Sequence, residues 1–161
     1  MPISLRPLAL PAAAARGRLW LGPMPGRAEG WAAFTSTARD TGLTLVVCLT
    51  PREEVAACSP QYHAAIVQGR LPFRWLHLPM RNFGLADELH TWREGVDAVS
   101  RGLMAGESVL LHCAEGIGRT GTTAACVLKR LGVDAASALQ QVRRAGSNPQ
   151  SAAQSGLIDT F

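Results

Sequence analysis

The sequence contains few of the features that mark specialised classes of protein. Its four cysteines show no CxxC spacing, so they indicate neither a disulfide-stabilised scaffold nor a cysteine zinc site. Only one of the 16 cationic residues is a lysine, and the arginines are scattered, which argues against a nucleic-acid-binding surface. No apolar run approaches the ~20 residues that span a membrane, and no internal repeat or low-complexity linker is present.

What remains is the composition of a compact domain. The chain has 161 residues, of which 47% are apolar and 17% charged, and its net charge is +4; these values exclude a disordered chain and a coiled coil. The apolar stretch 8–15 contains Pro11 and runs almost directly into a strand pattern, so it does not fit a cleaved signal peptide. We therefore expect a cytoplasmic protein without nucleic-acid or membrane partners. We expect residues 1–161 to form a single domain, with residues 1–17 as a poorly structured N-terminal extension.

Strand-like and helix-like segments alternate along the chain. Apolar and alternating runs predict strands over residues 18–21, 43–49, 73–79 and 108–112. Helices are predicted over residues 29–38, 88–104, 119–131 and 135–145, and in a short segment that Ser59 caps and Pro60 begins. Asp134 and Gly146 are the expected N-cap and stop of the last helix. The alternation predicts an α/β fold, a single domain with a small central, mostly parallel sheet flanked by helices.

The most informative segment is residues 109–121, Val-Leu-Leu-His-Cys-Ala-Glu-Gly-Ile-Gly-Arg-Thr-Gly. A buried strand ends at Cys113, a short loop follows, and a helix starts near Arg119. This order directs backbone N–H groups and a helix N-terminus toward one point, where they bind a tetrahedral dianion and favour a thiolate. Gly116 and Gly118 permit the positive φ angles and close approach of such a loop, and the arginine adds a bidentate fork.

These parts predict a two-step reaction at phosphorus. Cys113 would attack as a thiolate and form a phosphocysteine intermediate, which water then hydrolyses. Arg119 and the loop amides would stabilise the equatorial oxygens. Thr120 would donate a hydrogen bond to the thiolate, and His112 would order the loop from beneath. The predicted phosphate-binding residues are Ala114, Glu115, Gly116, Ile117, Gly118 and Arg119.

The string His-Cys-x-x-Gly-x-Gly-Arg-Thr-Gly resembles the C-x5-R loop of cysteine-dependent protein phosphatases. Residues 19–23, residues 46–54 and the segment from Arg144 through Pro149 to Gln154 extend the likeness to small dual-specificity phosphatases, particularly those similar to the cyclin-dependent kinase-associated phosphatase. The resemblance implies the cysteine-phosphatase fold, a phosphorylated protein or peptide as substrate, and phosphate, sulfate or vanadate as ligands of the loop. It also implies a supporting role for Gln154 and no cofactor. His63, His77 and His90 lack ligand spacing with any cysteine or carboxylate pair, so we expect no metal site, and we expect a monomer.

One departure from the family pattern concerns the general acid. The family carries an aspartic acid on a loop about thirty residues before the cysteine, and Asn82 stands at that position here. An amide cannot donate a proton to a leaving oxygen. Asp87 is the nearest acid that could take over, although it could instead cap the following helix; Glu88 and Glu115 are weaker candidates. Without an acid, aryl phosphates should be better substrates than alkyl phosphates.

Three functional hypotheses follow. The first is a phosphatase acting on phosphotyrosine and also on phosphoserine or phosphothreonine in proteins. The second, motivated by Asn82, is a phosphate-binding module with little turnover. The third, a sulfurtransferase or arsenate reductase, is disfavoured by the six-residue step from Cys113 to Arg119 and by the position of the loop late in the chain. Glu115 inside the loop argues against highly phosphorylated inositides, because the related lipid phosphatases place lysines there.

Overall fold

The fold is a five-stranded sheet between two layers of helices, seen in a computed structural model that describes residues 5–161. In chain order the elements are β1 (Arg6–Leu8), the 3-10 turn η1 (Ala12–Ala14), β2 (Arg18–Gly22), α1 (Trp31–Asp40), β3 (Leu45–Cys48), α2 (Arg52–Cys58), α3 (Pro60–Val67), β4 (Arg74–His77), α4 (Leu89–Met104), β5 (Ser108–His112), α5 (Gly118–Arg130), α6 (Ala135–Arg144) and α7 (Ala152–Thr160). The strand order is β1-β2-β5-β3-β4, and only the β1–β2 pair is antiparallel. The predicted α/β fold with a mostly parallel sheet is therefore confirmed.

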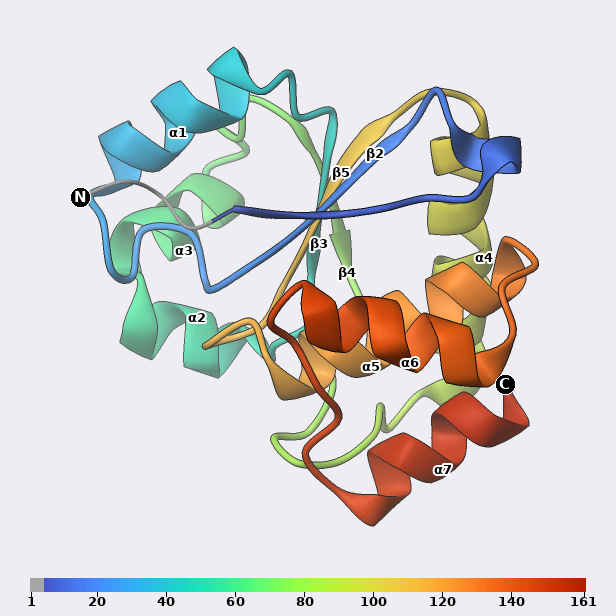
Figure 1. Cartoon of the computed structure of the whole chain (residues 1–161). Helices are drawn as coiled ribbons and strands as arrows, with labels where there is room; N and C mark the ends of the chain where they lie inside the picture. The colour runs from blue at the N-terminus through green and yellow to red at the C-terminus, as the bar shows by residue number, and fades with distance from the viewer. Residues whose placement is uncertain (1–4) are drawn as a thin grey trace.

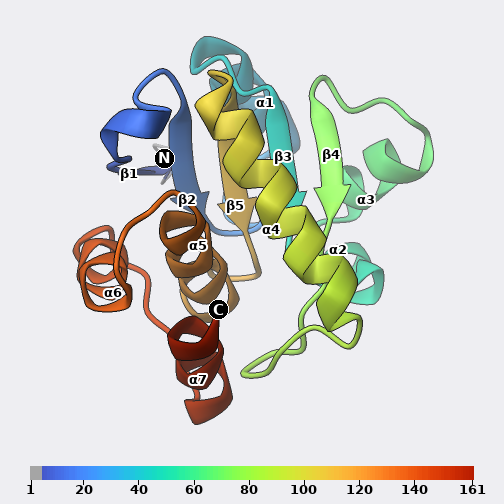
Figure 2. The ribbon, with the colours of Figure 1, turned by 90° about the vertical axis from the view of Figure 1, so that its right-hand side faces the viewer.

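The two faces of the sheet bury separate cores. In Figure 2, α4 and α5 lie across the front of the sheet and α1 lies behind it, while Figure 1 shows the same layers from the side. The larger core lies under α4 to α7 and includes Trp92, Val96 and Leu111; a smaller one joins α1 to Val46 and Leu110. The side chains of β5 are therefore buried on both faces of the sheet, as expected of a central parallel strand. None of the helices within residues 5–161 combines the length and apolarity needed to cross a membrane.

Helix α5 is the most enclosed helix in the chain. Every residue from Gly118 to Leu128 is buried, because α4, α6, α7 and the sheet surround it. Small residues allow this close packing: a Cβ at Gly121 would lie 2.7 Å from the backbone nitrogen of Asn148. The helix that follows Cys113 is consequently fixed on all sides, and so is its N-terminus.

The structure corrects two local expectations and confirms two others. The 1–17 segment was expected to be poorly structured, but residues 6–8 form β1 against β2 and residues 12–14 form η1; residues 1–4 lie outside the described part. Ser59 does not cap α3 with its side chain, because its hydroxyl donates to the Pro25 carbonyl at 2.7 Å. Asp134 caps α6 as predicted, accepting from the Ser137 N–H at 2.9 Å, and Gly146 follows that helix at φ 90°.

The four parallel strands all end at the same edge of the sheet. Their last residues are Gly22, Cys48, His77 and His112, and the chain between β5 and α5 crosses this edge beside the segments that follow β2, β3 and β4. Carboxyl ends of parallel strands are the usual location of ligand sites in α/β folds. The segment singled out in the sequence therefore lies where such a site is expected.

Candidate active site

The segment between β5 and α5, here called the Cys113 loop (residues 113–119), has its carbonyl groups turned outward. Four loop carbonyls accept hydrogen bonds from donors outside the loop: Cys113 from His112 Nδ1 (3.0 Å), Ala114 from the Met24 N–H (3.0 Å), Gly116 from Ser147 Oγ (2.6 Å) and Ile117 from the Asn148 N–H (3.1 Å). Gly116 has φ 79°, and a Cβ there would lie 2.5 Å from the Gly22 carbonyl. These four hydrogen bonds hold the loop from outside and keep the carbonyls turned away from its centre.

The N–H groups of the same loop are available for a ligand. Across residues 5–161, no protein acceptor receives the N–H of Ala114, Glu115, Ile117, Gly118 or Arg119. The last two of these belong to the first turn of α5, whose N–H groups have no intrahelical partner. A ring of backbone N–H groups at a helix N-terminus is a binding site for a tetrahedral anion.

The sulfur of Cys113 lies within this ring. The residue is 3% exposed, and its Sγ accepts hydrogen bonds from the Gly116 N–H at 3.2 Å and from Thr120 Oγ1 at 3.1 Å. Each donor presents a partial positive charge to the sulfur. The predicted arrangement of Cys113 and Thr120 is present in the geometry.

His112 lies directly beneath the loop and is completely buried. Burial lowers its pKa from 6.5 to about 4, and the nearby positive charge of Arg119 acts in the same direction. The ring is therefore neutral at physiological pH. Its Nδ1 donates to the Cys113 carbonyl, so its Nε2 must accept, and the Tyr62 hydroxyl donates to it at 2.8 Å. Trp75 Nε1 in turn donates to that hydroxyl at 2.8 Å. The direction of each hydrogen bond from Trp75 through Tyr62 and His112 to the Cys113 carbonyl is therefore fixed.

Arg119 is held by a carboxylate that sequence reasoning did not include in the site. The side chain is 3% exposed, and its Nη2 and Nη1 donate to the two carboxylate oxygens of Glu54 at 2.8 and 3.3 Å. Nη1 also donates to the Met80 carbonyl at 3.3 Å. These bonds occupy three of the five guanidinium N–H groups and leave the Nε–H and one Nη2–H, which share an edge. That edge matches two oxygens of a phosphate.

A cavity of about 280 Å³ opens over Cys113 and Arg119. Its lining consists of Arg27, Glu54, Cys58, Asn82, Phe83, Cys113, Ala114, Glu115, Ile117, Gly118, Arg119 and Gln150. Asn82 and Phe83 come from the segment after β4, here called the Asn82 loop (residues 81–87). Phe83 has φ 58°, a left-handed conformation that is rare for an aromatic residue, and its side chain is 57% exposed. The structure therefore places Asn82 in the lining of the same cavity as Cys113.

Gln154 connects the Asn82 loop to the rest of the site. Its side chain is fully buried, Nε2 donates to the Gly84 carbonyl at 3.0 Å, and Oε1 accepts from the Gln150 N–H at 2.8 Å. One amide thus joins the Asn82 loop to the segment that packs on Gly118. This geometry is consistent with the supporting role expected for Gln154.

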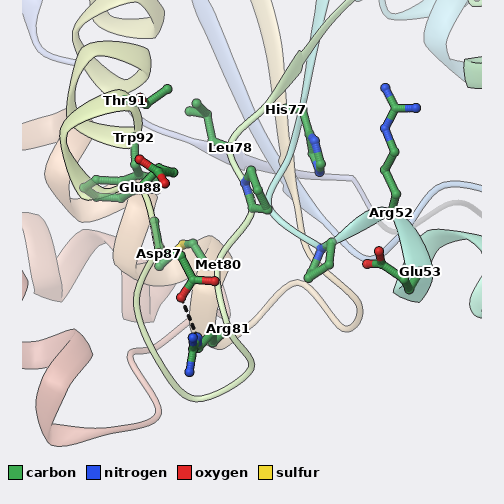
Figure 3. Close-up of a pocket in the computed structure, with 13 residues that line it drawn as sticks. Arg52, Glu53, His77, Leu78, Met80, Arg81, Asp87, Glu88, Thr91 and Trp92 are labelled. Carbon is green, nitrogen blue, oxygen red and sulfur yellow. Dashed lines mark hydrogen bonds and ion pairs between the residues drawn. The ribbon is translucent and has the colours of Figure 1, made fainter.

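Asp87 does not lie in the cavity that contains Cys113. Figure 3 shows its carboxylate directed at Arg81, to whose Nε it binds at 2.5 Å, in a different cavity of about 510 Å³. Its side chain is 67% exposed. The alternative role as N-cap of the following helix is wrong, because Glu88 occupies the N-cap of α4. The prediction that Asp87 takes the acid position finds no support in this geometry.

The comparisons with known proteins agree with the fold. Residues 29–156 match the family model described as a Swiss Army Knife protein, DSP-PTPase phosphatase domain. The chain is also similar to the crystal structure of kinase associated phosphatase in a form whose catalytic-site cysteine is serine. That alignment has 20% identity and a TM-score of 0.81, and it covers 100% of this chain and 94% of the other.

Two further structures illustrate the range of proteins that share the fold. Tk-PTP in its active form is 24% identical, with a TM-score of 0.68 and 90% of each chain covered. The human tyrosine phosphatase-like serine/threonine/tyrosine-interacting protein is 22% identical, with a TM-score of 0.64 and 88% and 89% of the two chains covered. The comparison with curated proteins finds no match. At these identities the solved structures show the fold alone.

Proposed function

The chain belongs to the DSP-PTPase family of phosphatases, and we propose that it is an active cysteine-dependent phosphomonoesterase that prefers aryl phosphates, with phosphotyrosine in proteins or peptides as its substrate. The observation that supports this most is the position of the Cys113 sulfur inside a ring of free backbone N–H groups. A thiolate at the centre of an anion site is placed to attack a bound phosphorus atom.

The first step forms a sulfur–phosphorus bond and breaks the bond between phosphorus and the leaving oxygen. The N–H groups of the Cys113 loop and the free edge of Arg119 bind the three equatorial oxygens and stabilise their charge during transfer. Glu54 acts on this step through Arg119, because its bidentate ion pair fixes the plane of the guanidinium. The leaving oxygen departs with the electron pair of the broken bond.

The second step is hydrolysis of the phosphocysteine. A water molecule attacks phosphorus and gives up a proton to solvent, the sulfur–phosphorus bond breaks, Cys113 leaves as a thiolate and inorganic phosphate is released. Thr120, whose hydroxyl lies 3.1 Å from the sulfur, stabilises that thiolate by donating a hydrogen bond. His112 is neutral and has both nitrogens occupied, so we assign it to holding the loop and not to proton transfer.

The preference for aryl phosphates follows from the leaving-group side of the cavity. Two carboxylates line it: Glu54 is paired with Arg119, and Glu115 belongs to the loop that binds the phosphate. Asn82 can donate an N–H to the leaving oxygen but cannot protonate it. A phenolate, with a conjugate-acid pKa of about 10, departs without a proton far more readily than a serine alkoxide. The exposed ring of Phe83 adds an apolar surface for the aryl group.

A phosphate-binding module with little turnover is the second candidate, and Asn82 is the observation that favours it. Such a protein would retain the anion site and the cysteine but hydrolyse aryl and alkyl phosphates equally slowly. Turnover on an aryl phosphate therefore separates the two functions.

The experiment compares hydrolysis of 4-nitrophenyl phosphate, a phosphotyrosine peptide and the matching phosphoserine peptide. We expect wild-type turnover on the first two, with Cys113→Ser and Arg119→Ala each reducing kcat/KM by about a thousandfold or more. Cys126→Ser changes a buried cysteine of α5 that does not line the cavity, so this variant should retain activity and serves as the control. Wild-type activity no higher than that of Cys113→Ser would refute the proposal.

A further inference from the structure

Arg6, on the N-terminal strand β1, reaches under the Cys113 loop. Its Nη2 donates to the Gly116 carbonyl at 2.5 Å, and its Nη1 donates to the Ala145 carbonyl at 2.6 Å and to Ser147 Oγ at 3.0 Å. Ser147 Oγ donates to the same Gly116 carbonyl at 2.6 Å. The Gly116 oxygen therefore has both of its lone pairs occupied, by groups 110 and 31 residues away in the sequence.

The Gly116 peptide group occupies a central position in the loop. Its own N–H donates to the Cys113 sulfur, and its left-handed φ of 79° is the point at which the loop reverses direction. If the Gly116 carbonyl were unpaired, rotation of the peptide group between Gly116 and Ile117 would direct the carbonyl oxygen, with its partial negative charge, toward the phosphate. A charged donor on the outer side of the loop opposes that rotation more strongly than a neutral one does.

We infer that Arg6 is a positioning residue for the phosphate-binding loop: with Ser147 it holds the Gly116 carbonyl outward, so that the loop N–H groups face the oxyanion. This inference rests on the proposed function, because it assumes that the Cys113 loop binds the phosphate of the substrate. Its consequence is that β1, a strand of three residues at the edge of the sheet, forms part of the functional site.

Electrostatics support the same assignment. Partial burial lowers the pKa of Arg6 below its usual range, whereas the negative charge of Cys113 opposes that shift, so the two groups interact across the loop. The other charges around Cys113 are Arg119 from α5, Glu54 from α2 paired with it, Glu115 in the loop itself, and Arg27, which lines the same cavity. Arg6 is thus a further positive charge near the anion site, and unlike Arg119 and Arg27 it does not line the cavity.

The test measures binding of sodium tungstate, a tetrahedral oxyanion, by calorimetry at a temperature where each variant is folded, together with kcat and KM for 4-nitrophenyl phosphate. We expect Arg6→Gln to weaken tungstate binding about tenfold and Ser147→Ala about threefold, in line with the loss of a charged and a neutral hydrogen bond. Arg6→Lys, which still presents a charged donor, should recover most of the affinity. Arg130→Gln removes a surface ion pair with Asp97 and should lower stability without changing tungstate affinity.

The outcomes separate this inference from the proposed function. Equal tungstate affinity of folded Arg6→Gln and wild type, or a failure of Arg6→Lys to bind better than Arg6→Gln, would overturn the role of Arg6. Wild-type protein that binds tungstate but does not turn over would refute the proposed enzyme activity and leave the positioning role supported. If Arg6→Gln does not fold, Ser147→Ala and Arg6→Lys still measure the effect on the oxyanion site.

Discussion

The Cys113 loop and the Asn82 loop face each other across one cavity and are built in opposite ways. In the Cys113 loop, four carbonyls are held from outside, the cysteine and arginine are each 3% exposed, and His112 beneath is completely buried. In the Asn82 loop, Phe83 and Asp87 are mostly exposed, and the acid expected from the family pattern is an amide.

Under the proposed function, the difference means that phosphate binding and leaving-group protonation are separable parts of this fold. A phosphate site needs many donors that already point at one place, and the packing around α5 and β5 provides them. A general acid needs only one titratable side chain on a loop, and its replacement does not disturb the binding half. Variants in the Cys113 loop and in the Asn82 loop should therefore affect different steps of the reaction.

The largest effect is expected in the Cys113 loop. Arg119→Lys keeps the charge but removes both the bidentate pair with Glu54 and the flat edge that binds two phosphate oxygens. We expect kcat/KM for 4-nitrophenyl phosphate to fall by about a hundredfold to a thousandfold. Arg130→Lys, on the same helix at the surface, is the matched control and should change it by less than about twofold. A loss below tenfold would show that the guanidinium geometry is not needed.

The second prediction concerns the free energy of unfolding of the protein at acidic pH, which depends on His112 beneath the Cys113 loop. His112 has a pKa of about 4 in the folded protein and about 6.5 when unfolded, so the unfolded chain binds the extra proton between those values. The free energy of unfolding is therefore highest above pH 6.5 and should fall by about 3 kcal/mol as the pH drops to 4. Denaturant unfolding of wild type and His112→Gln at several pH values measures the difference.

The variant His90→Gln is the control for that measurement. His90 is exposed on α4, where it pairs with Glu94, and its replacement shows what removing an exposed histidine does to the slope; His112→Gln should flatten the pH dependence. Equal slopes for wild type and His112→Gln would mean that the buried imidazole does not remain neutral.

The third prediction restores the acid in the Asn82 loop. Asn82→Asp places a carboxyl group on the leaving-group side of the cavity, and we expect kcat for an alkyl phosphate such as the phosphoserine peptide to rise about thirtyfold. Aryl phosphate turnover should change much less, since phenolate leaves without protonation. Asp87→Asn is the matched test of the alternative acid and should leave both rates within about twofold. A large loss in Asp87→Asn would reinstate Asp87 as the acid.

Sequence reasoning located the Cys113 loop because the signal is local. A buried strand, a cysteine, two glycines and a helix start follow one another within residues 109–121, and each has its own physical meaning. The parallel sheet was predictable for a similar reason, since β3 and β5 are apolar on both faces.

The residues that hold the loop could not be found in that way. Glu54, Tyr62 and Arg6 lie 65, 50 and 110 residues from their partners, and no periodicity connects them. Strand β1 has three residues and contains a proline, which only an edge strand tolerates, so its pattern resembled an irregular extension. One signal was available for Glu54: a buried arginine needs a carboxylate, and an acidic pair follows the second predicted strand.

The smallest predicted effect separates binding of the aryl group from chemistry. Phe83 is 57% exposed at the cavity mouth, so its ring is free to contact a phenyl group of the substrate. We expect Phe83→Ala to raise KM for the phosphotyrosine peptide about fivefold, to leave KM for the phosphoserine peptide unchanged, and to alter kcat little. Phe83→Gly is the companion variant, because glycine adopts the observed φ of 58° without strain and so isolates the loss of the ring. If both variants change the two peptides equally, Phe83 shapes the Asn82 loop and does not select aryl phosphates.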